Sequence, residues 1–371
     1  MRFLKDLPEL SGKKVLLRAD FNVPISGGRV VDSFRIDKTI PTISFLREKD
    51  AQLIIVSHYE GKEGNTLKPV AEFLEKIFPV SFITNPFSDE GKSALQKAFG
   101  EKKVVLIENL RVWPGEKDND DSFAKSLASL ADIYVNDAFS VSHRKHASVV
   151  GVPKHIPAYV GLLLEDEVKN LSKAFDPARP FLFVLGGAKF DTKMPLIEKF
   201  FKKADMVFVG GALANNFFKE KGFPLGKSLV SEGDFKLGQF STDRLFIPPD
   251  VVVQSERGTQ IIKPTDVAED ETIVDSGPET SRLLQKLIWK AEFILWNGPL
   301  GNYELGFTGG TEDLAKAIAQ SKRDSVVGGG DTLAAIAKLN LFNKLSFVST
   351  GGGAMLDFLA NETLPGIEVL N

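Results

Sequence analysis

The chain of 371 residues contains no cysteine. Disulfide bonds and thiolate metal sites are therefore excluded, and the absence is consistent with a reducing compartment. A charge excess is also missing, because 46 lysines and arginines face 49 aspartates and glutamates, which leaves a net charge of -3. This balance argues against non-specific nucleic-acid binding through the overall field of the protein. Any basic site must be local.

Long apolar runs are missing as well. The first residues, Met1–Asp6, carry charges and lack the apolar stretch of a signal peptide. No later segment has the uninterrupted apolar length of a membrane span. We therefore predict a cytoplasmic protein that binds neither nucleic acid nor membrane.

Strand-like apolar runs alternate with helix-length segments along the chain, for example the helices expected over residues 68–78 and 121–131. This alternation predicts an α/β fold with parallel sheets covered by helices on both faces. The length exceeds that of a single core, so two domains are expected. Residues 158–175 favour one helix, and the cluster Asp176–Pro180 then stops it. We place a domain boundary near 155–180.

The first half ends its strands in polar side chains, and ligands in open α/β sheets bind beyond those strand ends. Several converging arginines indicate a small anion with more than one charge, since a guanidinium binds carboxylate or phosphate through two parallel hydrogen bonds. Asp20 and Asn22 could hold a hydroxyl group. Taken singly, each arginine could instead form a surface ion pair. The polar residues at or near these ends are Arg18, Asp20, Asn22, Arg35, His58, Arg111, His143, Arg144 and His146.

His143 and His146 could also form a metal pair. Arg144 and Lys145 stand between them and disfavour a cation, and no third ligand is evident.

The second half ends its strands in glycine. Glycine lets backbone N–H groups approach a ligand, and a helix that starts there adds partial positive charge, so the pattern suits phosphate. The alternative is tight packing of strand-to-helix turns. The glycines stand at residues 186–187, 210–211, 298, 328–330 and 351–353.

Lys189 and Lys193 follow the first glycine pair and are four residues apart, so on a helix they would point the same way. Two ammonium groups beside glycines suit a polyphosphate, although a solvated lysine face would show the same spacing. Asp331, directly after a glycine triplet, could cap a helix or hold Mg²⁺ near a nucleotide. Residues 222–228 resemble a P-loop, but they have three residues between the glycines where that motif needs four.

Together these motifs resemble the phosphoglycerate kinase family over essentially the whole chain. Their order and spacing are specific to that family. The segments that carry the resemblance are residues 18–24, 108–111, 135–139, 143–146, 185–189, 296–299, 328–332 and 349–354.

The resemblance implies reversible phosphoryl transfer from 1,3-bisphosphoglycerate to MgADP in glycolysis, giving 3-phosphoglycerate and MgATP. It also implies a monomer with two doubly wound, Rossmann-like parallel-sheet domains joined by a helix, which bend about a hinge. Residues 1–157 would bind the glycerate ligand, 158–175 would form the joining helix, and 176–356 would bind the nucleotide. Residues 357–371 would return to the first domain.

The same resemblance implies roles for individual residues. Arg35, Lys189 and Lys193 would be catalytic, and Asp331 would serve Mg²⁺. The glycerate ligand would meet Asp20, Asn22, Arg35, His58, Arg111 and Arg144. The nucleotide would meet Gly187, Ala188, Lys189, Lys193, Gly211, Asn297, Pro299, Glu304, Gly328, Gly329, Gly330, Asp331 and Thr332.

Two segments depart from the family pattern. After Ser57-His58 the family usually has Leu-Gly-Arg-Pro, whereas this chain has residues 59–62 as Tyr-Glu-Gly-Lys, so Gly61 replaces an arginine. Lys62 could substitute, but an ammonium group does not reproduce a bidentate guanidinium. Asn302 and Tyr303 stand where the family usually has Val-Phe before Glu304. The alternatives are a diverged relative with another acyl-phosphate substrate and a non-catalytic nucleotide-binding protein.

Overall fold

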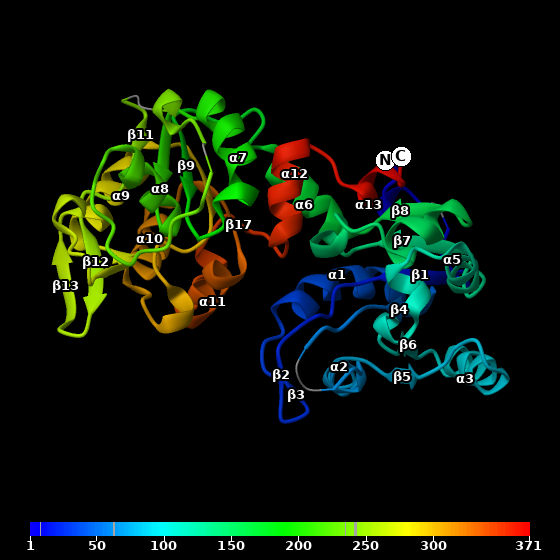
Figure 1. Cartoon of the computed structure of the whole chain (residues 1–371). Helices are drawn as coiled ribbons and strands as arrows, with labels where there is room; N and C mark the ends of the chain where they lie inside the picture. The colour runs from blue at the N-terminus through cyan, green and yellow to red at the C-terminus, as the bar shows by residue number, and fades with distance from the viewer. Residues whose placement is uncertain (8, 62–63, 234, 241–242) are drawn as a thin grey trace. The chain divides into compact units, whose positions relative to one another are not determined.

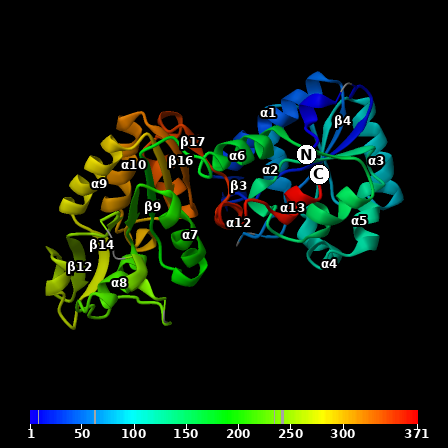
Figure 2. The same ribbon diagram turned by 90° about the horizontal axis from the view of Figure 1, so that it is seen from above.

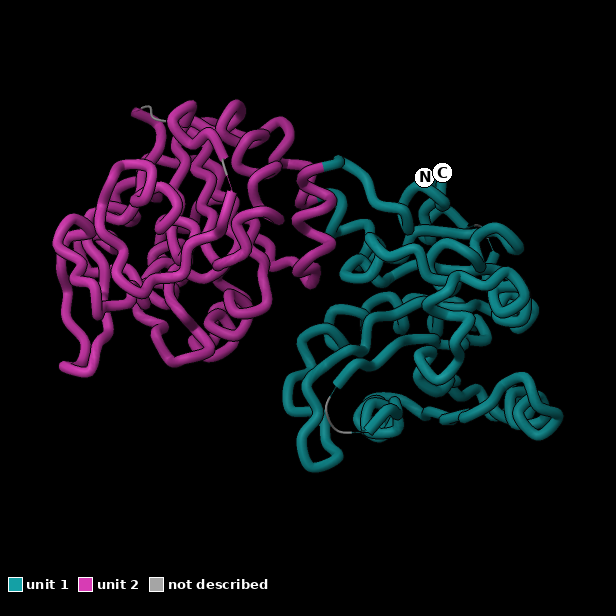
Figure 3. The backbone as a smooth tube through the Cα atoms, viewed as in Figure 1, with its two compact units in different colours: residues 1–169, 361–371 teal, residues 170–360 magenta. Residues whose placement is uncertain are grey.

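The computed structural model describes residues 1–371 except 8, 62–63, 234 and 241–242 (Figure 1). The chain forms two compact units (Figure 3). One contains Met1–Lys169 together with Asn361–Asn371, and the other contains Asn170–Ala360. Each unit is described by itself below.

The first unit is built on a six-stranded parallel sheet in the order β5-β6-β4-β1-β7-β8. Most of its strand residues are buried, as expected for a parallel sheet covered on both faces. A two-stranded hairpin of Ile25–Ser26 (β2) and Arg29–Val30 (β3) lies outside this sheet. The six strands are Lys14–Arg18 (β1), Gln52–Val56 (β4), Val80–Ile83 (β5), Val104–Ile107 (β6), Ile133–Asn136 (β7) and Ala158–Val160 (β8).

Helices lie on both sides of this sheet (Figure 2). Phe34–Glu48 (α1) and Lys68–Leu74 (α2) share one core with the strands, in which Ile43 and Leu74 pack with Leu17 and Ile55. Asp89–Gly100 (α3) and Asp121–Ala128 (α5) lie on the other side, and Pro114–Lys117 (α4) is a short helix near α5. The chain runs from β1 to β4 on one side and adds β7 on the other side of β1. The sheet therefore has its topological switch point between β1 and β7, where a ligand is expected beyond the strand ends.

The second unit has a six-stranded parallel sheet in the order β11-β10-β9-β15-β16-β17. Its switch point lies between β9 and β15, because β10 and β11 extend the sheet on one side and β16 and β17 on the other. The strands are Phe181–Leu185 (β9), Met206–Val209 (β10), Leu245–Phe246 (β11), Phe293–Asn297 (β15), Asp324–Gly328 (β16) and Phe347–Val348 (β17).

Helices cover this sheet from both sides too. Phe190–Lys203 (α7) and Ala212–Glu220 (α8) lie on one side, with Pro278–Lys290 (α9) and Gly309–Ser321 (α10) on the other (Figure 2). A separate antiparallel sheet in the order β13-β12-β14 is inserted before α9. Further strands and helices are Val251–Ser255 (β12), Gly258–Ile262 (β13), Thr272–Ser276 (β14), Gly330–Lys338 (α11) and Gly353–Asn361 (α12).

The segment expected as one helix over 158–175 differs from that prediction. Residues 158–160 form β8, which pairs in parallel with β7, and the helix α6 covers Leu162–Ser172. An apolar run beside the open edge of a sheet gains ladder hydrogen bonds as a strand, which outweighs its helical pattern. The helices expected over 68–78 and 121–131 are also shorter, ending at Leu74 and Ala128. The boundary between the two units falls within α6.

The last residues pack on the first unit. Gly366 N donates to Ser142 O at 2.7 Å, and Asn136 Nδ2 donates to Gly366 O at 3.1 Å. Pro365–Glu368 form a short helix (α13), and Val369 packs against a cluster that includes Val141 and Val149. The unit boundary comes at residue 361, later than the 357 of the expected tail, because α12 continues to Asn361.

The predicted α/β class with two doubly wound parallel sheets is confirmed. In the described part of the chain, no helix combines the length and the apolar character needed to span a membrane.

Candidate functional site

Asp20 follows β1 at the switch point of the first sheet and holds two of the predicted residues. Its Oδ2 lies 3.1 Å from Arg35 Nη1, and its Oδ1 lies 3.7 Å from His58 Nδ1. The Ser140 hydroxyl donates to the same carboxylate. Burial alone would raise the pKa of Asp20, but Arg35, His58 and these hydrogen bonds hold it below its usual value. Asp20 is therefore a charged anchor.

His58 follows β4 and is buried beside Asp20. Burial lowers the pKa of His58 to about 3, which outweighs the opposing effect of Asp20, and the nearby Arg18 lowers it further. Arg18 Nη2 lies 3.4 Å from His58 Nδ1. The ring is therefore neutral at pH 7 and can serve as a hydrogen-bonding group but not as a cation.

Arg111 and Arg144 converge on Glu60. Arg111 Nε donates to Glu60 Oε1 at 3.0 Å, and Arg144 Nη1 lies 3.5 Å from Glu60 Oε2. Lys117 Nζ lies 3.1 Å from Glu60 Oε1. Burial opposes ionisation of Glu60, yet its hydrogen bond to Lys117 and the charge of Arg111 lower its pKa to about 2. A carboxylate is thus fixed among three cationic side chains.

Asn22 joins these two groups. Its backbone oxygen accepts a hydrogen bond from Arg35 Nη1 at 3.0 Å, and its Oδ1 accepts one from Glu60 N at 3.0 Å. Asp20, Asn22, Arg35, His58, Arg111 and Arg144 are therefore linked in one cluster, with Glu60 as a shared partner. We call these six residues and Glu60 the anion site.

Arg18 and His146, two further polar residues expected at or near the strand ends, lie next to the anion site. Arg18 is fully buried and donates to Ser148 Oγ at 2.8 Å and to Ala19 O, so it supports the site from within the unit. His146 Nδ1 lies 3.1 Å from Arg111 Nη1. Burial and the neighbouring arginines lower the pKa of His146 to about 4. Among the described residues, no group of three or more His, Cys, Asp or Glu side chains that could hold a metal ion occurs.

Gly61, the position that lacks the expected arginine, is explained by packing. A Cβ atom at Gly61 would lie 1.9 Å from the Tyr59 hydroxyl oxygen, and Tyr59 is buried in the core of the first unit. A side chain at position 61 would thus require Tyr59 to move. Lys62, considered as a substitute cation, lies outside the described residues.

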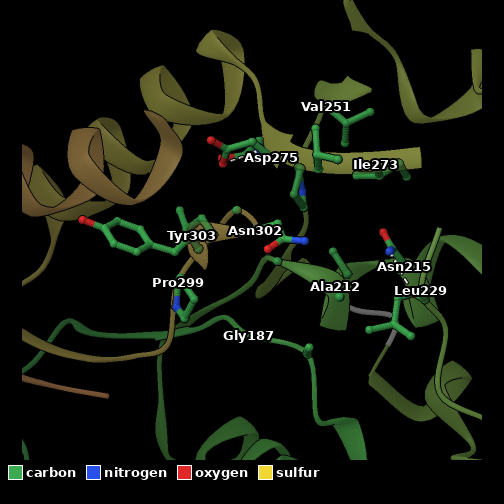
Figure 4. A pocket seen from close by; sticks show the side chains of 18 of the residues that line it. Gly187, Ala212, Asn215, Leu229, Val251, Ile273, Asp275, Pro299, Asn302 and Tyr303 are labelled. Carbon is green, nitrogen blue, oxygen red and sulfur yellow. Dashed lines mark hydrogen bonds between the residues drawn. The ribbon is translucent and has the colours of Figure 1, made fainter. Parts of the chain in front are cut away.

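The second unit has a pocket of about 290 Å³ at the carboxyl ends of its strands. Figure 4 shows Val251 and Ile273 on one side of this pocket and Gly187 and Pro299 on the other. The apolar wall suits the flat face of a nucleobase, while the opposite side offers backbone. Of the expected nucleotide residues, the pocket is lined by Gly187, Ala188, Gly211, Pro299, Glu304 and Asp331.

Lys193 lies beside this pocket and is buried. Its Nζ donates to Gly186 O at 2.5 Å and to Asn297 Oδ1 at 3.2 Å. Burial lowers the pKa of Lys193 to about 8, although Asp331 opposes the shift. An ammonium group that is buried in this way gains charge stabilisation from any phosphate placed near it.

The expectation that Lys189 and Lys193 point the same way is wrong. Helix α7 begins at Phe190, so Lys189 is the residue before the helix and does not follow its periodicity. Lys189 is exposed, whereas Lys193 is buried. The two ammonium groups are consequently in different environments.

Some of these glycines are required by close packing, whereas at another the Cβ position is open. A Cβ atom at Gly186 would lie 2.2 Å from Pro299 O, and Gly211 has a φ of +61° with Gly187 N 2.7 Å from its Cβ position. Packing of the strand ends therefore requires glycine at these positions. At Gly330 no heavy atom lies within 4 Å of the Cβ position, so packing does not explain that glycine.

Asp331 stands in the first turn of α11, whose N-cap is Gly329, so it does not cap the helix. Burial raises the pKa of Asp331, and Glu304 raises it further. A nearby cation would relieve both effects. Mg²⁺ is commonly held by one or two carboxylates together with phosphates and water, so this single carboxylate fits the Mg²⁺ of a bound nucleotide.

Several residues that were expected to bind the nucleotide do not line the pocket. Several residues that line it were not predicted from the sequence. Lys193 donates a hydrogen bond to Asn297, and Lys193 Nζ lies 2.9 Å from the Cβ position of Gly187, which lines the pocket. Thr332 Oγ1 is buried and has no hydrogen-bond partner among the described residues. No sequence signal identified the lining residues that β12, β14 and α8 contribute, since they come from distant segments. Expected residues outside the lining are Lys189, Lys193, Asn297, Gly328, Gly329, Gly330 and Thr332, and the missed ones include Ala212, Asn215, Leu229, Val251, Ile273 and Asp275.

The comparison with protein families decides the assignment. The family model described as phosphoglycerate kinase matches residues 4–362. The chain belongs to the phosphoglycerate kinase family. It is therefore a kinase, a transferase of glycolysis, and the predicted family and enzyme class are confirmed.

Individual relatives agree with this. The chain is 42% identical over 387 residues to the phosphoglycerate kinase of Rubrobacter xylanophilus, and the match covers 100% of this chain and 98% of the relative. It is 37% identical to the structure of phosphoglycerate kinase from Coxiella burnetii, with a TM-score of 0.82 and coverage of 99% and 98%. The Pyrococcus horikoshii OT3 phosphoglycerate kinase structure has a TM-score of 0.85 at 30% identity, with coverage of 100% and 98%.

Proposed function

We propose that this chain catalyses reversible transfer of a phosphoryl group from 1,3-bisphosphoglycerate to MgADP, giving 3-phosphoglycerate and MgATP. The observation that carries the proposal is the different chemistry of its two switch points. At the switch point of the first sheet, the strands are followed by residues of an arginine cluster. At that of the second sheet, they are followed by glycines beside a partly apolar pocket.

The anion site binds the glycerate ligand in this proposal. Arg111, Arg144 and Arg35 neutralise its phosphate and carboxylate groups, since guanidinium groups bind both in a bidentate manner. Asp20 and Asn22 accept or donate hydrogen bonds to its hydroxyl, and the neutral His58 adds an uncharged contact.

The pocket of the second unit binds the nucleotide. Its apolar wall receives the base, and Glu304 contacts the ribose. Lys193, Lys189 and the amides around Gly187, Gly211 and Gly329 hold the phosphates. Asp331 contacts Mg²⁺, which arrives with the nucleotide as part of the substrate and neutralises phosphate charge.

The transfer itself needs charge neutralisation and alignment more than a general base. Arg35 stabilises the moving phosphoryl group from the side of the glycerate, and Lys193 does so from the side of the nucleotide. The acyl phosphate must reach the nucleotide, so the proposal includes the hinge bending implied by the resemblance. We further propose that the enzyme acts as a cytoplasmic monomer.

A coupled assay tests this proposal. Purified protein is supplied with 3-phosphoglycerate and MgATP, and the formation of 1,3-bisphosphoglycerate is followed. We expect turnover that depends on both substrates and on Mg²⁺. Intact ATP binding without turnover would favour a non-catalytic nucleotide-binding protein, and turnover with another acyl phosphate alone would favour a diverged relative.

A further inference from the structure

Glu60 occupies the anion site in a way that the proposed reaction does not require. Its carboxylate receives Arg111 Nε at 3.0 Å and Lys117 Nζ at 3.1 Å, and Arg144 Nη1 lies at 3.5 Å. These are the contacts that an anionic substrate group would make with the same cations. The residue thus fills the place of a ligand with a side chain of the protein itself.

We propose that Glu60 is an internal competing anion, which the anionic group of the glycerate ligand must displace from Arg111 and Arg144. Glu60 thereby sets a low affinity for that ligand. This inference rests on the proposed function, because it assigns the arginines to substrate binding.

Arg111 has two carboxylate partners, and the structure distinguishes them. Glu116 is fully buried, lies 3.6 Å from Arg111 Nη1, and accepts hydrogen bonds from Ser148 N at 2.9 Å and Ser148 Oγ at 2.7 Å. It is therefore a fixed support behind the guanidinium. The side chain of Glu60 is 32% exposed, so its carboxylate can reach solvent. Glu60 is the partner that can be exchanged for a ligand.

The guanidinium retains capacity for a ligand as well. Arg111 Nη2 is buried and has no hydrogen-bond partner among the described residues. Its side chain is only 4% exposed, so it cannot turn to solvent to satisfy this donor. An incoming anion would satisfy Nη2 and take over Nε from Glu60, which gives the bidentate contact that guanidinium groups favour.

The charge balance at this loop points the same way. Where the family usually has Gly-Arg, this chain has Glu60 and Gly61, so one positive charge is absent and one negative charge is added. Each exposed or partly exposed ion pair contributes little by itself. Because Glu60 forms three such pairs, its carboxylate competes substantially with the anionic substrate for the same cationic side chains.

The test replaces Glu60 by glutamine, which has nearly the same size and no charge. In the 371-residue chain we expect Glu60→Gln to lower KM for 3-phosphoglycerate by about tenfold, because three weak ion pairs are removed, while KM for MgATP stays unchanged. Glu101→Gln is the matched control. Glu101 forms an ion pair with Lys103 at 2.7 Å. It precedes β6, so it lies at the amino end of a strand, whereas the anion site lies at the carboxyl ends. Its substitution changes the net charge by the same amount. It should leave both constants unchanged.

Calorimetric titration with inorganic phosphate provides a readout that does not depend on turnover. We expect Glu60→Gln to bind phosphate about tenfold more tightly than the wild type, and an added Arg144→Gln substitution to reverse most of this gain. If Glu60 only holds the arginines in place, Glu60→Gln will raise KM for 3-phosphoglycerate and weaken phosphate binding. Either that result or unchanged values with intact MgADP binding overturns the inference. Absent turnover in the wild type would count against the proposed reaction, while the phosphate titration would still decide the role of Glu60.

Discussion

In the proposed function, Arg35 both binds the glycerate ligand and stabilises the phosphoryl group that is transferred. Its Nη1 lies 3.1 Å from Asp20 Oδ2 and 3.0 Å from Asn22 O. The side chain remains 29% exposed, so part of the guanidinium can contact a ligand. This arrangement fixes its direction while leaving donors available.

We predict that Arg35→Ala lowers kcat by roughly 10²- to 10³-fold, the usual effect of removing one preorganised donor to a developing charge. The affinity for ATP should stay within about twofold, because Arg35 and the nucleotide pocket belong to different units. Steady-state kinetics and ATP titration measure the two effects. Arg29→Ala, at an exposed arginine of the same unit, serves as the control. A selective loss of ATP binding in Arg35→Ala would refute the assigned role.

His58 gives a pH prediction. Burial lowers its pKa to about 3, so the imidazole ring should be neutral between pH 5 and 8. The His58 ring signals in NMR spectra should therefore show no titration in this range, and His58→Gln identifies those signals by their loss. A midpoint between pH 5 and 8 would mean that Asp20 outweighs burial, and that the anion site contains one more cation.

At the level of elements, the first turn of helix α6 is hydrogen-bonded to a side chain that follows strand β7. Asp137, directly after β7, accepts hydrogen bonds from Leu163 N at 2.8 Å and Leu164 N at 3.4 Å. These amides belong to the first turn of α6, which has no partner for them within the helix. Asp137 thus caps the helix that links the two units. Burial raises the pKa of Asp137 to about 7, and Asp166 raises it further.

This shift predicts a pH-dependent stability. The folded-state pKa lies above the usual value of 3.8, so the protonated carboxyl stabilises the fold fully below about pH 4, and this contribution is lost as the pH rises through 7. Asp137→Asn stays uncharged. Its melting temperature should therefore fall less between pH 5 and 8.5 than that of the wild type, as followed by calorimetry.

The exposed Asp118 supplies the control for this measurement, since Asp118→Asn should keep the slope of the wild type. An equal slope for Asp137→Asn and the wild type would show that Asp137 is ionised in the fold throughout this range.

At the level of the whole molecule, each unit has its own sheet, and the proposed function assigns a different ligand to each unit. Ligands should therefore order the two units separately. We predict that MgADP slows amide hydrogen exchange around residues 186–190 and 211–214, and that 3-phosphoglycerate slows it around residues 18–22 and 57–60. Mass spectrometry of peptides measures both effects. Protection of residues 18–22 by MgADP, without protection of residues 186–190, would contradict the assignment of the two sites.

The amino-acid sequence by itself determined the α/β class and the contrast between the two sets of strand ends. Both follow from local information, namely the alternation of apolar and polar segments and the residue type directly after each strand. The anion cluster was predictable for the same reason, since parallel strands bring their carboxyl ends to one edge and so collect Asp20, His58 and Arg111.

Only the tertiary structure decided which segments from distant parts of the chain meet. Residues 158–160 form a strand because β7 offers an edge. Lys189 is exposed and Lys193 is buried, because α7 begins only at Phe190. Glu60 became significant only when Arg111 and Arg144, 51 and 84 residues away, were placed around it. Side-chain charge can be read from a sequence, but its partner depends on the folded path of the chain.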